Sequence, residues 1–209
     1  MGVGDEHGRL RTLAVYKVNE IFCSLQGEGY WTGTPMVFVR LSGCNLQCPF
    51  CDTSHQEGRP MQAEEIVAAV RSCGGAATRV CLTGGEPLLQ ADGQLTDALH
   101  AAGYKLHLET NGTCAVPEGI DWVTVSPKAG VAGLKGNATV VLQQADELKL
   151  VLAAGVDPQR WVDFPATWHF LQPCAAPDGR SNAAETVAYV LAHPQWRLSL
   201  QTHKLLDIR

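Results

Sequence analysis

Three cysteines stand close together in the first quarter of the chain. Cys44, Cys48 and Cys51 occur in the segment GCNLQCPFCDT, which gives a Cys-x3-Cys-x2-Cys spacing. Three thiolates this close can bind one inorganic centre. A cubane iron–sulfur cluster, which normally takes four cysteines, would then keep one iron open to a further ligand. A structural zinc site with His55 as the fourth ligand is the alternative, although the spacing matches none of the common two-pair zinc patterns.

The remaining five cysteines stand singly, and we expect them to be small hydrophobic residues without a shared role. Eight cysteines in 209 residues are too few for a disulfide scaffold of this size. Free or metal-bound thiols are typical of a reducing compartment, and the N-terminal residues carry no secretory signal pattern. We therefore expect a cytoplasmic protein.

Strands and helices are predicted in alternation around the cysteine segment. Apolar patterning predicts strands at 14–22, 36–41, 79–84, 105–110, 121–127, 147–152, 168–173 and 196–200. Helical spacing and end signals predict helices at 61–73, 94–102 and 182–193. Such alternation implies parallel strands joined by crossover helices.

The length limits how complete this architecture can be. Eight full strand–helix units typically need about 250 residues, whereas the chain has 209. We count about six parallel strands, with helices missing or shortened in the second half. The predicted fold class is therefore α/β, an incomplete (β/α)6-type barrel related to the TIM barrel with parallel strands and reduced helices, and residues 1–209 form one domain.

Glycine-rich or polar segments follow several predicted strands. They are Gly43–Cys44, Thr83–Pro87, Glu109–Gly112, Ser126–Lys128 and Gln172–Pro173. In parallel α/β folds the carboxyl ends of the strands meet at one rim, where ligands bind. We expect these segments to become neighbours and to form a site.

The charge balance argues against some classes of partner. Sixteen basic and twenty-one acidic residues leave a net charge of −5, and 45% of the residues are hydrophobic. A negative chain offers no long-range attraction to nucleic acid or to anionic lipid. No apolar run approaches the roughly 18 to 20 residues that span a membrane. We expect neither a nucleic-acid nor a membrane partner.

The cysteine triplet followed by TGGEP resembles the radical S-adenosylmethionine (SAM) superfamily. This resemblance implies that Cys44, Cys48 and Cys51 hold a [4Fe-4S] cluster whose open iron binds the methionine amino and carboxylate groups of SAM. It also implies that Gly84–Pro87 lies along that amino group. Glycines allow the close approach of backbone carbonyls that this contact needs. Glu86 has a structural alternative, as a ligand of backbone or of a lysine.

Longer segments narrow the resemblance further. SLQGEGYWTGTPMVFVRLSGCNLQCPFCDT, TGGEPLLQ, ETNGT, VSPK, ELKLV, FLQP and LSLQTHKLLDIR are similar to the 7-carboxy-7-deazaguanine synthase family. The resemblance implies a radical ring contraction of 6-carboxy-5,6,7,8-tetrahydropterin to 7-carboxy-7-deazaguanine, with loss of ammonia and with SAM regenerated. A glycyl-radical activating enzyme, or a non-catalytic binding module stabilised by zinc, are the alternatives.

The family resemblance also assigns roles to residues. Substrate contacts are expected from Leu25, Gln26, Gly27, Arg40, Thr83 and Arg209. SAM contacts are expected from Phe50, Cys51, Asp52, Gly85, Ser126, Pro127, Lys128, Gln172, Pro173, Cys174 and Ala175. Thr53 matches the position that ligates Mg²⁺.

The end of the chain departs from the family pattern. The family often ends in a proline whose carboxylate meets the substrate, whereas this chain ends in Arg209. We expect the Arg209 carboxylate to make that contact, with His203 nearby as a further candidate. A flavodoxin- or ferredoxin-type electron donor and a homodimer are the partners that the resemblance implies.

Overall fold

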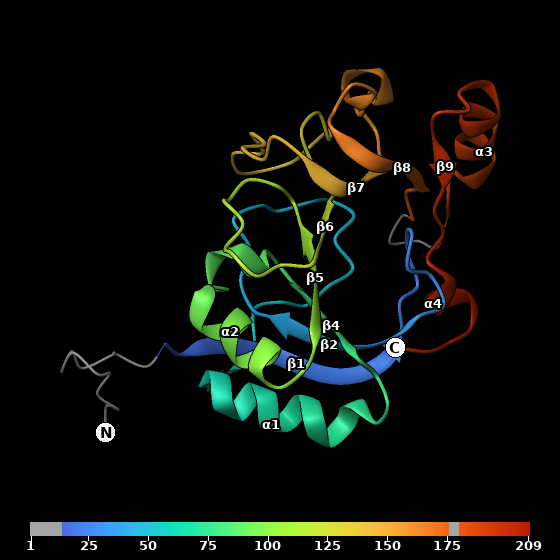
Figure 1. Ribbon diagram of the computed structural model, residues 1–209. Coiled ribbons are helices and arrows are strands. Elements are labelled where there is room, and N and C mark those ends of the chain that lie inside the picture. Colours follow the sequence, from blue (N-terminus) through green and yellow to red (C-terminus); the bar gives the residue numbers. More distant parts are fainter. Residues whose placement is uncertain (1–13, 176–179) are drawn as a thin grey trace.

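A computed structural model describes residues 14–175 and 180–209, and within them one open nine-stranded sheet organises the chain (Figure 1). The strands are β1 (Tyr16–Leu25), β2 (Pro35–Leu41), β3 (Arg59–Met61), β4 (Arg79–Gly84), β5 (Lys105–Thr110), β6 (Trp122–Val125), β7 (Ala145–Leu152), β8 (Ala166–Pro173) and β9 (Arg197–Leu198). The helices are α1 (Ala63–Gly74), α2 (Gly93–Ala101), α3 (Ala183–Ala192) and α4 (Thr202–Leu205), with 3-10 turns η1 (Pro87–Leu89) and η2 (Pro158–Trp161).

The sheet confirms the predicted incomplete barrel. Its strand order is β3-β1-β2-β4-β5-β6-β7-β8-β9, and neighbours from β2 to β9 pair in parallel. The parallel set is therefore β2 with β4 to β9, seven strands rather than about six. β1 and β3 add an antiparallel edge. Within the described residues β3 and β9 do not pair, so the sheet stays open between them.

The helices cover the first half of the sheet better than the second. α1 begins at a capping box in which Glu65 Oε2 accepts from the Gln62 amide at 2.7 Å, and Gly75, at a φ of 54°, follows its end. α2 begins where Asp92 accepts from the Leu95 amide at 3.1 Å. No α-helix lies between β5 and β7, where residues 111–121 and 126–144 form the connections. This asymmetry matches the prediction of reduced helices.

Short elements were the ones that the apolar pattern missed. β3 and α4 were not predicted, because three or four residues give no periodic signal. The strand predicted at 196–200 is wrong in length: β9 holds Arg197 and Leu198, after which Ser199 bonds to β8 and to the loop after β1. Among the described residues, no helix has the length and apolarity needed to cross a membrane.

Candidate active site

A cavity of about 630 Å³ lies at the carboxyl ends of the parallel strands. Its size suits a small ligand, for which pockets of about 300–1,000 Å³ are usual. All five strand-end segments contribute to its wall, as their topology predicted. The cavity wall includes these predicted site residues: Leu25, Gln26, Gly27, Arg40, Cys44, Cys48, Phe50, Cys51, Asp52, Thr53, Thr83, Gly85, Ser126, Lys128, Gln172, Pro173, Ala175 and Arg209. Pro127 and Cys174 do not line it.

The cysteine triplet lies in the loop that follows β2 and faces this cavity. The Cys51 amide donates to the Cys48 carbonyl at 3.1 Å, and the Leu46 amide donates to Cys44 Sγ at 3.4 Å. Burial raises the pKa of the Cys44 and Cys48 thiols, while the nearby Lys128 ammonium lowers it. Lys128 thus supplies positive charge where thiolate ligands need it.

The three thiols of this loop offer the kind of donor set that an iron–sulfur cluster uses. One tetrahedral zinc would bring its thiolates to about 3.8 Å from one another, given Zn–S bonds of about 2.3 Å. In the part of the chain that the structure describes, the triplet is not among the sets of ligand atoms that lie within 4.8 Å of one another. Thiols further apart than this can still bind a multi-iron centre, because each cysteine binds a different iron.

The described residues hold one set of ligand atoms within 4.8 Å, formed by Cys81, His107 and Glu109. Glu109 Oε2 already accepts from the Lys149 ammonium at 2.8 Å. A cation placed there would be repelled by that charge. We assign no metal to this set.

Glycines at the end of β4 let the backbone of this segment approach the cysteine loop. A Cβ atom at Gly85 would lie 2.0 Å from the Gly43 carbonyl oxygen, and one at Gly84 would lie 2.0 Å from that of Leu41. Side chains at these two positions would push the segments apart. The glycine pair is therefore needed for packing as well as for any approach to a ligand.

Glu86 connects strand ends instead of facing the cavity. Its fully buried carboxylate accepts from the Leu88 amide at 3.0 Å, the Thr110 hydroxyl at 2.8 Å and the Asn111 amide at 2.7 Å. The Asn111 side chain in turn donates to Asn45 in the cysteine loop at 3.0 Å. The structural alternative for Glu86 holds in this geometry.

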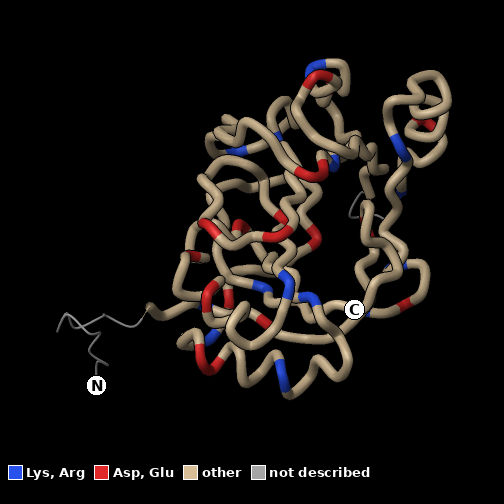
Figure 2. Tube along the Cα trace, in the orientation of Figure 1, with Lys and Arg blue, Asp and Glu red and all other residues tan. Residues whose placement is uncertain are grey.

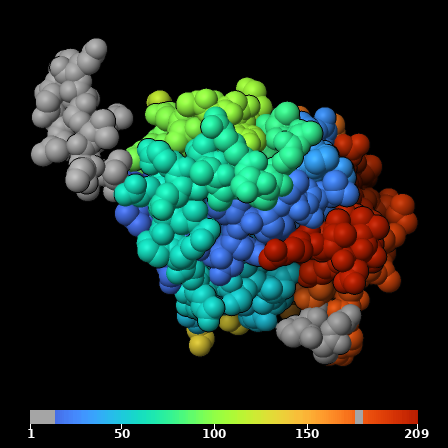
Figure 3. Space-filling model, turned by 90° about the horizontal axis from the view of Figure 1, so that it is seen from below, coloured from blue at the N-terminus to red at the C-terminus, as the bar shows by residue number. Residues whose placement is uncertain are grey.

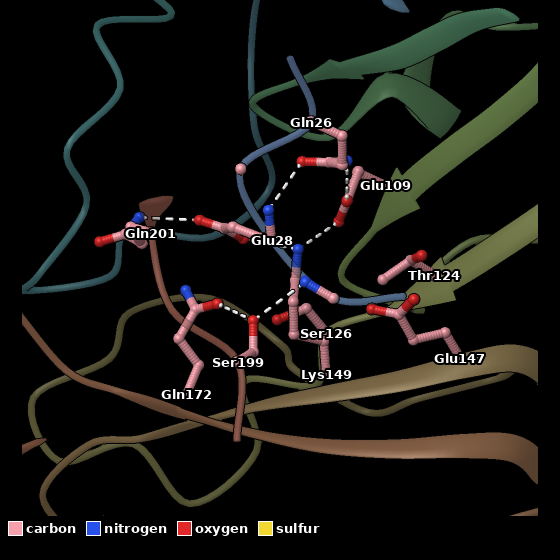
Figure 4. Close-up of polar contacts among 12 residues, drawn as sticks. Gln26, Glu28, Glu109, Thr124, Ser126, Glu147, Lys149, Gln172, Ser199 and Gln201 are labelled. Atoms are coloured by element: carbon pink, nitrogen blue, oxygen red, sulfur yellow. Dashed lines mark hydrogen bonds and ion pairs between the residues drawn. The ribbon is translucent and has the colours of Figure 1, made fainter. Parts of the chain in front are cut away.

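A buried lysine forms the centre of the polar network in Figure 4. Lys149 on β7 is 4% exposed, and its Nζ donates to Glu28 at 2.6 Å and to Glu109 at 2.8 Å. Gln26 donates to the other oxygen of Glu109 at 3.1 Å, and Gln201 donates to Glu28 at 2.8 Å. Figure 2 marks acidic and basic residues on strands as well as in helices and loops.

The network shifts the pKa values of Glu28 and Lys149 in opposite directions. Burial opposes the charge on Glu28, but Lys149 and Gln201 stabilise the carboxylate and lower its pKa to about 2. Burial also opposes the charge on Lys149, yet Glu109 and Glu28 raise its pKa. Lys149 and Glu28 are therefore both charged near neutral pH. Two carboxylates around one ammonium give this wall of the cavity a surplus of acceptors.

Two arginines share one carboxylate on β1 at another part of the cavity. Arg40 Nε donates to Glu20 Oε1 at 2.8 Å, and the Arg209 guanidinium pairs with Glu20 Oε2. The Arg209 guanidinium also lies 4.8 Å from the centre of the Phe22 ring. The main-chain oxygen of Arg209 accepts from the Ser24 hydroxyl. Arg209 thus reaches the cavity wall with its backbone already bonded to β1.

Thr53 lies beside an ion pair at the rim. Its hydroxyl is 3.4 Å from Asp52 Oδ1, and Asp52 pairs with Lys204 from α4. His203 also lines the cavity. Its imidazole lies so close to Gly27 that a Cβ atom at Gly27 would clash with it. The C-terminal segment therefore forms one side of the site.

Comparison with known proteins identifies the architecture. Residues 38–131 match the family model of the radical SAM superfamily. The chain is 53% identical to the 7-carboxy-7-deazaguanine synthase of Bacteroides thetaiotaomicron, over 92% of this chain and 98% of that protein. The chain belongs to the 7-carboxy-7-deazaguanine synthase family. The alternatives of an activating enzyme and of a zinc-stabilised module are not favoured by these matches.

Two further family members agree. The synthase of Bradyrhizobium diazoefficiens is 43% identical, over 93% of this chain and 99% of that protein. The crystal structure of QueE from Escherichia coli has a TM-score of 0.70 and 30% identity, and the match covers 89% of this chain and 93% of that one. The family and the fold predicted from the sequence are both confirmed.

Sequence reasoning assigned no role to Lys149, Glu109 or Gln201, although all three lie in quoted motifs. In ELKLVL, alternation places Glu147 and Lys149 on one face of β7. A lysine on an inward-facing strand position is the signal that could have revealed the network, because an unpaired buried lysine is rare.

Proposed function

We propose that this chain converts 6-carboxy-5,6,7,8-tetrahydropterin to 7-carboxy-7-deazaguanine with loss of ammonia. The observation that carries the proposal is the convergence of the cysteine loop, the glycine pair and the loop of Gln26 to Glu28 on one cavity, in a chain similar to named synthases over nearly its whole length. In this proposal, residues 1–209 form one domain that carries out the whole reaction.

Cys44, Cys48 and Cys51 would hold the [4Fe-4S] cluster, and Lys128 would stabilise the thiolates beside it. When bound, the cluster supplies the electron for reductive cleavage of SAM, which provides the radical chemistry. SAM would contact Phe50, Cys51, Asp52, Gly85, Ser126, Pro127, Lys128, Gln172, Pro173, Cys174 and Ala175. Pro127 and Cys174 do not line the cavity, so they would contribute through backbone position alone. Thr53 would offer its hydroxyl to Mg²⁺, which keeps several waters in most sites.

The charges on the cavity wall suit the two ends of the pterin. Glu28 and Glu109 present acceptors, which match the N–H groups of the amino-pyrimidinone edge. Arg40 is bonded to Glu20 through Nε, and its terminal nitrogens would offer a planar fork to the substrate carboxylate. Leu25, Gln26, Gly27, Thr83 and Arg209 would complete the substrate contacts.

A flavodoxin- or ferredoxin-type protein would deliver the electron, and two copies of the chain would form a homodimer. Thiolates that must remain reduced until the cluster assembles suit a reducing compartment such as the cytoplasm.

Anaerobic reconstitution tests the function. Purified protein is loaded with iron and sulfide and supplied with SAM, Mg²⁺, a reductant and the carboxytetrahydropterin. We expect a brown protein that forms 7-carboxy-7-deazaguanine. Cys48→Ala should lose both colour and product, whereas Cys73→Ala, at an exposed position on α1, should keep both. Stoichiometric zinc without a brown chromophore, or an intact cluster without product, would overturn the proposal.

A further inference from the structure

Two buried side chains outside the cavity bind the backbone of the loop that follows β1. The Gly29 amide donates to Ser199 Oγ at 3.0 Å, and the Tyr30 amide donates to Glu147 Oε2 at 3.0 Å. Glu147 is 1% exposed and Ser199 is 3% exposed. Neither lines the cavity. Two consecutive amides of one loop therefore donate to side chains that lie outside the cavity wall.

The backbone of this loop fits closely against Glu147. Gly29 has a φ of +65°, and a Cβ atom there would lie 1.9 Å from Glu147 Oε1. A side chain at this position would clash with the carboxylate and would strain the backbone. The conformation of the loop and the place of the Glu147 carboxylate thus depend on each other.

The same loop also contacts residues at the amino ends of two strands through its tyrosine ring. The Tyr30 ring stacks on Trp122 and Trp168, with centroids 5.0 Å and 5.1 Å away. Trp122 begins β6, and Trp168 lies near the start of β8, so these rings are at the amino ends of the strands. The loop therefore extends from the cavity, at Gln26 to Glu28, to an aromatic contact at the amino ends of β6 and β8.

We propose that Glu147 and Ser199 are positioning residues that hold the loop so that Glu28 and Gln26 face the pterin. Glu28 immediately precedes the two fixed amides, and its carboxylate meets Lys149 only while the loop keeps this path. The Ser199 hydroxyl also donates to Gln172 Oε1 at 2.8 Å (Figure 4). One hydroxyl thus links the substrate loop to a residue proposed to contact SAM. The proposal rests on the proposed function.

Hydrogen–deuterium exchange of the full chain tests the structural half of the proposal. In Glu147→Ala and in Ser199→Ala, the amides of residues 27–31 should exchange about tenfold faster, because a buried hydrogen bond is lost. Glu147→Gln keeps an acceptor for the Tyr30 amide and should exchange as the wild type does. Amides of β4 serve as an internal reference for global unfolding.

Asp146→Ala is the matched control. Asp146 is the neighbouring acid on β7 and also accepts from a backbone amide, that of Val123 at 2.7 Å, away from the loop. Its loss should leave exchange in residues 27–31 unchanged. Equal loop exchange in Glu147→Ala and wild type, or faster loop exchange in Asp146→Ala, would overturn the structural half.

Kinetics test the functional half. Glu147→Ala should raise the KM for the pterin by about tenfold with kcat changed by less than about threefold, and Glu147→Gln should restore the wild-type KM. The KM for SAM should stay constant in both. An active wild type with unchanged pterin KM in Glu147→Ala would overturn the positioning role. An inactive wild type with altered loop exchange would instead refute the proposed function and leave the loop support established.

Discussion

The two halves of the sheet are stabilised in different ways. From β1 to β5, one apolar core packs the strands against α1 and α2, with Val39, Leu82 and Ile66 fully buried. From β6 onward the apolar cluster is smaller, and β7 turns Glu147 and Lys149 toward the interior. Hydrophobic burial thus shapes the half that carries the cysteine loop, whereas polar bonds order much of the other half. Substitutions in the two halves should differ in kind.

Lys149→Met is expected to have the largest effect. It removes the ammonium between Glu28 and Glu109, and removing one partner of a buried ion pair costs about 3–5 kcal/mol. The loss should be greater at pH 8 than at pH 5.5, because the unpaired carboxylates can bind protons at the lower pH. Denaturant unfolding measures it. A decrease in the free energy of unfolding of less than about 1 kcal/mol at pH 8 is the value typical of surface ion pairs. It would contradict the view that polar bonds stabilise this half of the sheet.

Ile66→Ala probes the apolar half. Ile66 on α1 is fully buried in the first core, and such a truncation costs about 2–5 kcal/mol of unfolding free energy. The folded fraction should keep the pterin KM of the wild type, since α1 does not line the cavity. Unfolding curves and steady-state kinetics on one preparation provide the check. A changed KM would show that the helix-covered half also tunes the site.

Glu147→Gln separates charge from hydrogen bonding in the polar half. Burial raises the pKa of Glu147 from 4.5 to about 7, against the opposing effect of Lys149. Between pH 4.5 and about pH 7, the folded protein therefore keeps a proton on Glu147 that the unfolded chain releases. Its free energy of unfolding falls as the pH rises through that range. Glutamine does not titrate, so the free energy of unfolding of Glu147→Gln relative to that of the wild type should be about 1–3 kcal/mol higher at pH 8 than at pH 5. Parallel unfolding curves at the two pH values measure this, and a pH-independent difference would contradict the shifted pKa.

Arg40→Lys should have the smallest effect on folding and a measurable one on substrate binding. Lysine keeps the charge but loses the fork, so the pterin KM should rise roughly tenfold, equivalent to about 1.4 kcal/mol. The KM for SAM should not change. Equal pterin KM values in the two proteins would remove Arg40 from the proposed carboxylate contact.

Long periodic elements were predictable from the sequence. The strand predicted at 79–84 is observed as β4 (Arg79–Gly84), and the helix predicted at 61–73 is α1 (Ala63–Gly74). Their apolar residues repeat at the period of the element, which is a local signal. The strand-end motifs could be placed on one rim because parallel topology brings carboxyl ends together.

Contacts between distant segments were not predictable in this way. Lys149 and Glu28 are separated by 121 positions, and no local sequence pattern indicates that these two side chains form a pair. The Glu147 contact with Tyr30 depends on a turn at Gly29 whose φ cannot be inferred from the residue type alone. Residue alternation shows that Glu147 and Lys149 share a face but not what that face meets.

The segment after β9 runs back to the first strand of the sheet. Thr202 bonds to the Gly27 carbonyl across 175 positions, and Figure 3 shows the last residues lying against the N-terminal part of the chain. During synthesis, the first apolar core can form while this segment is still unmade. Gly27 gains its partner only after residue 202 has left the ribosome. Maturation of the substrate loop should therefore be one of the last events of folding, and a nascent chain stopped before this segment should bury its first core yet remain unable to capture a pterin.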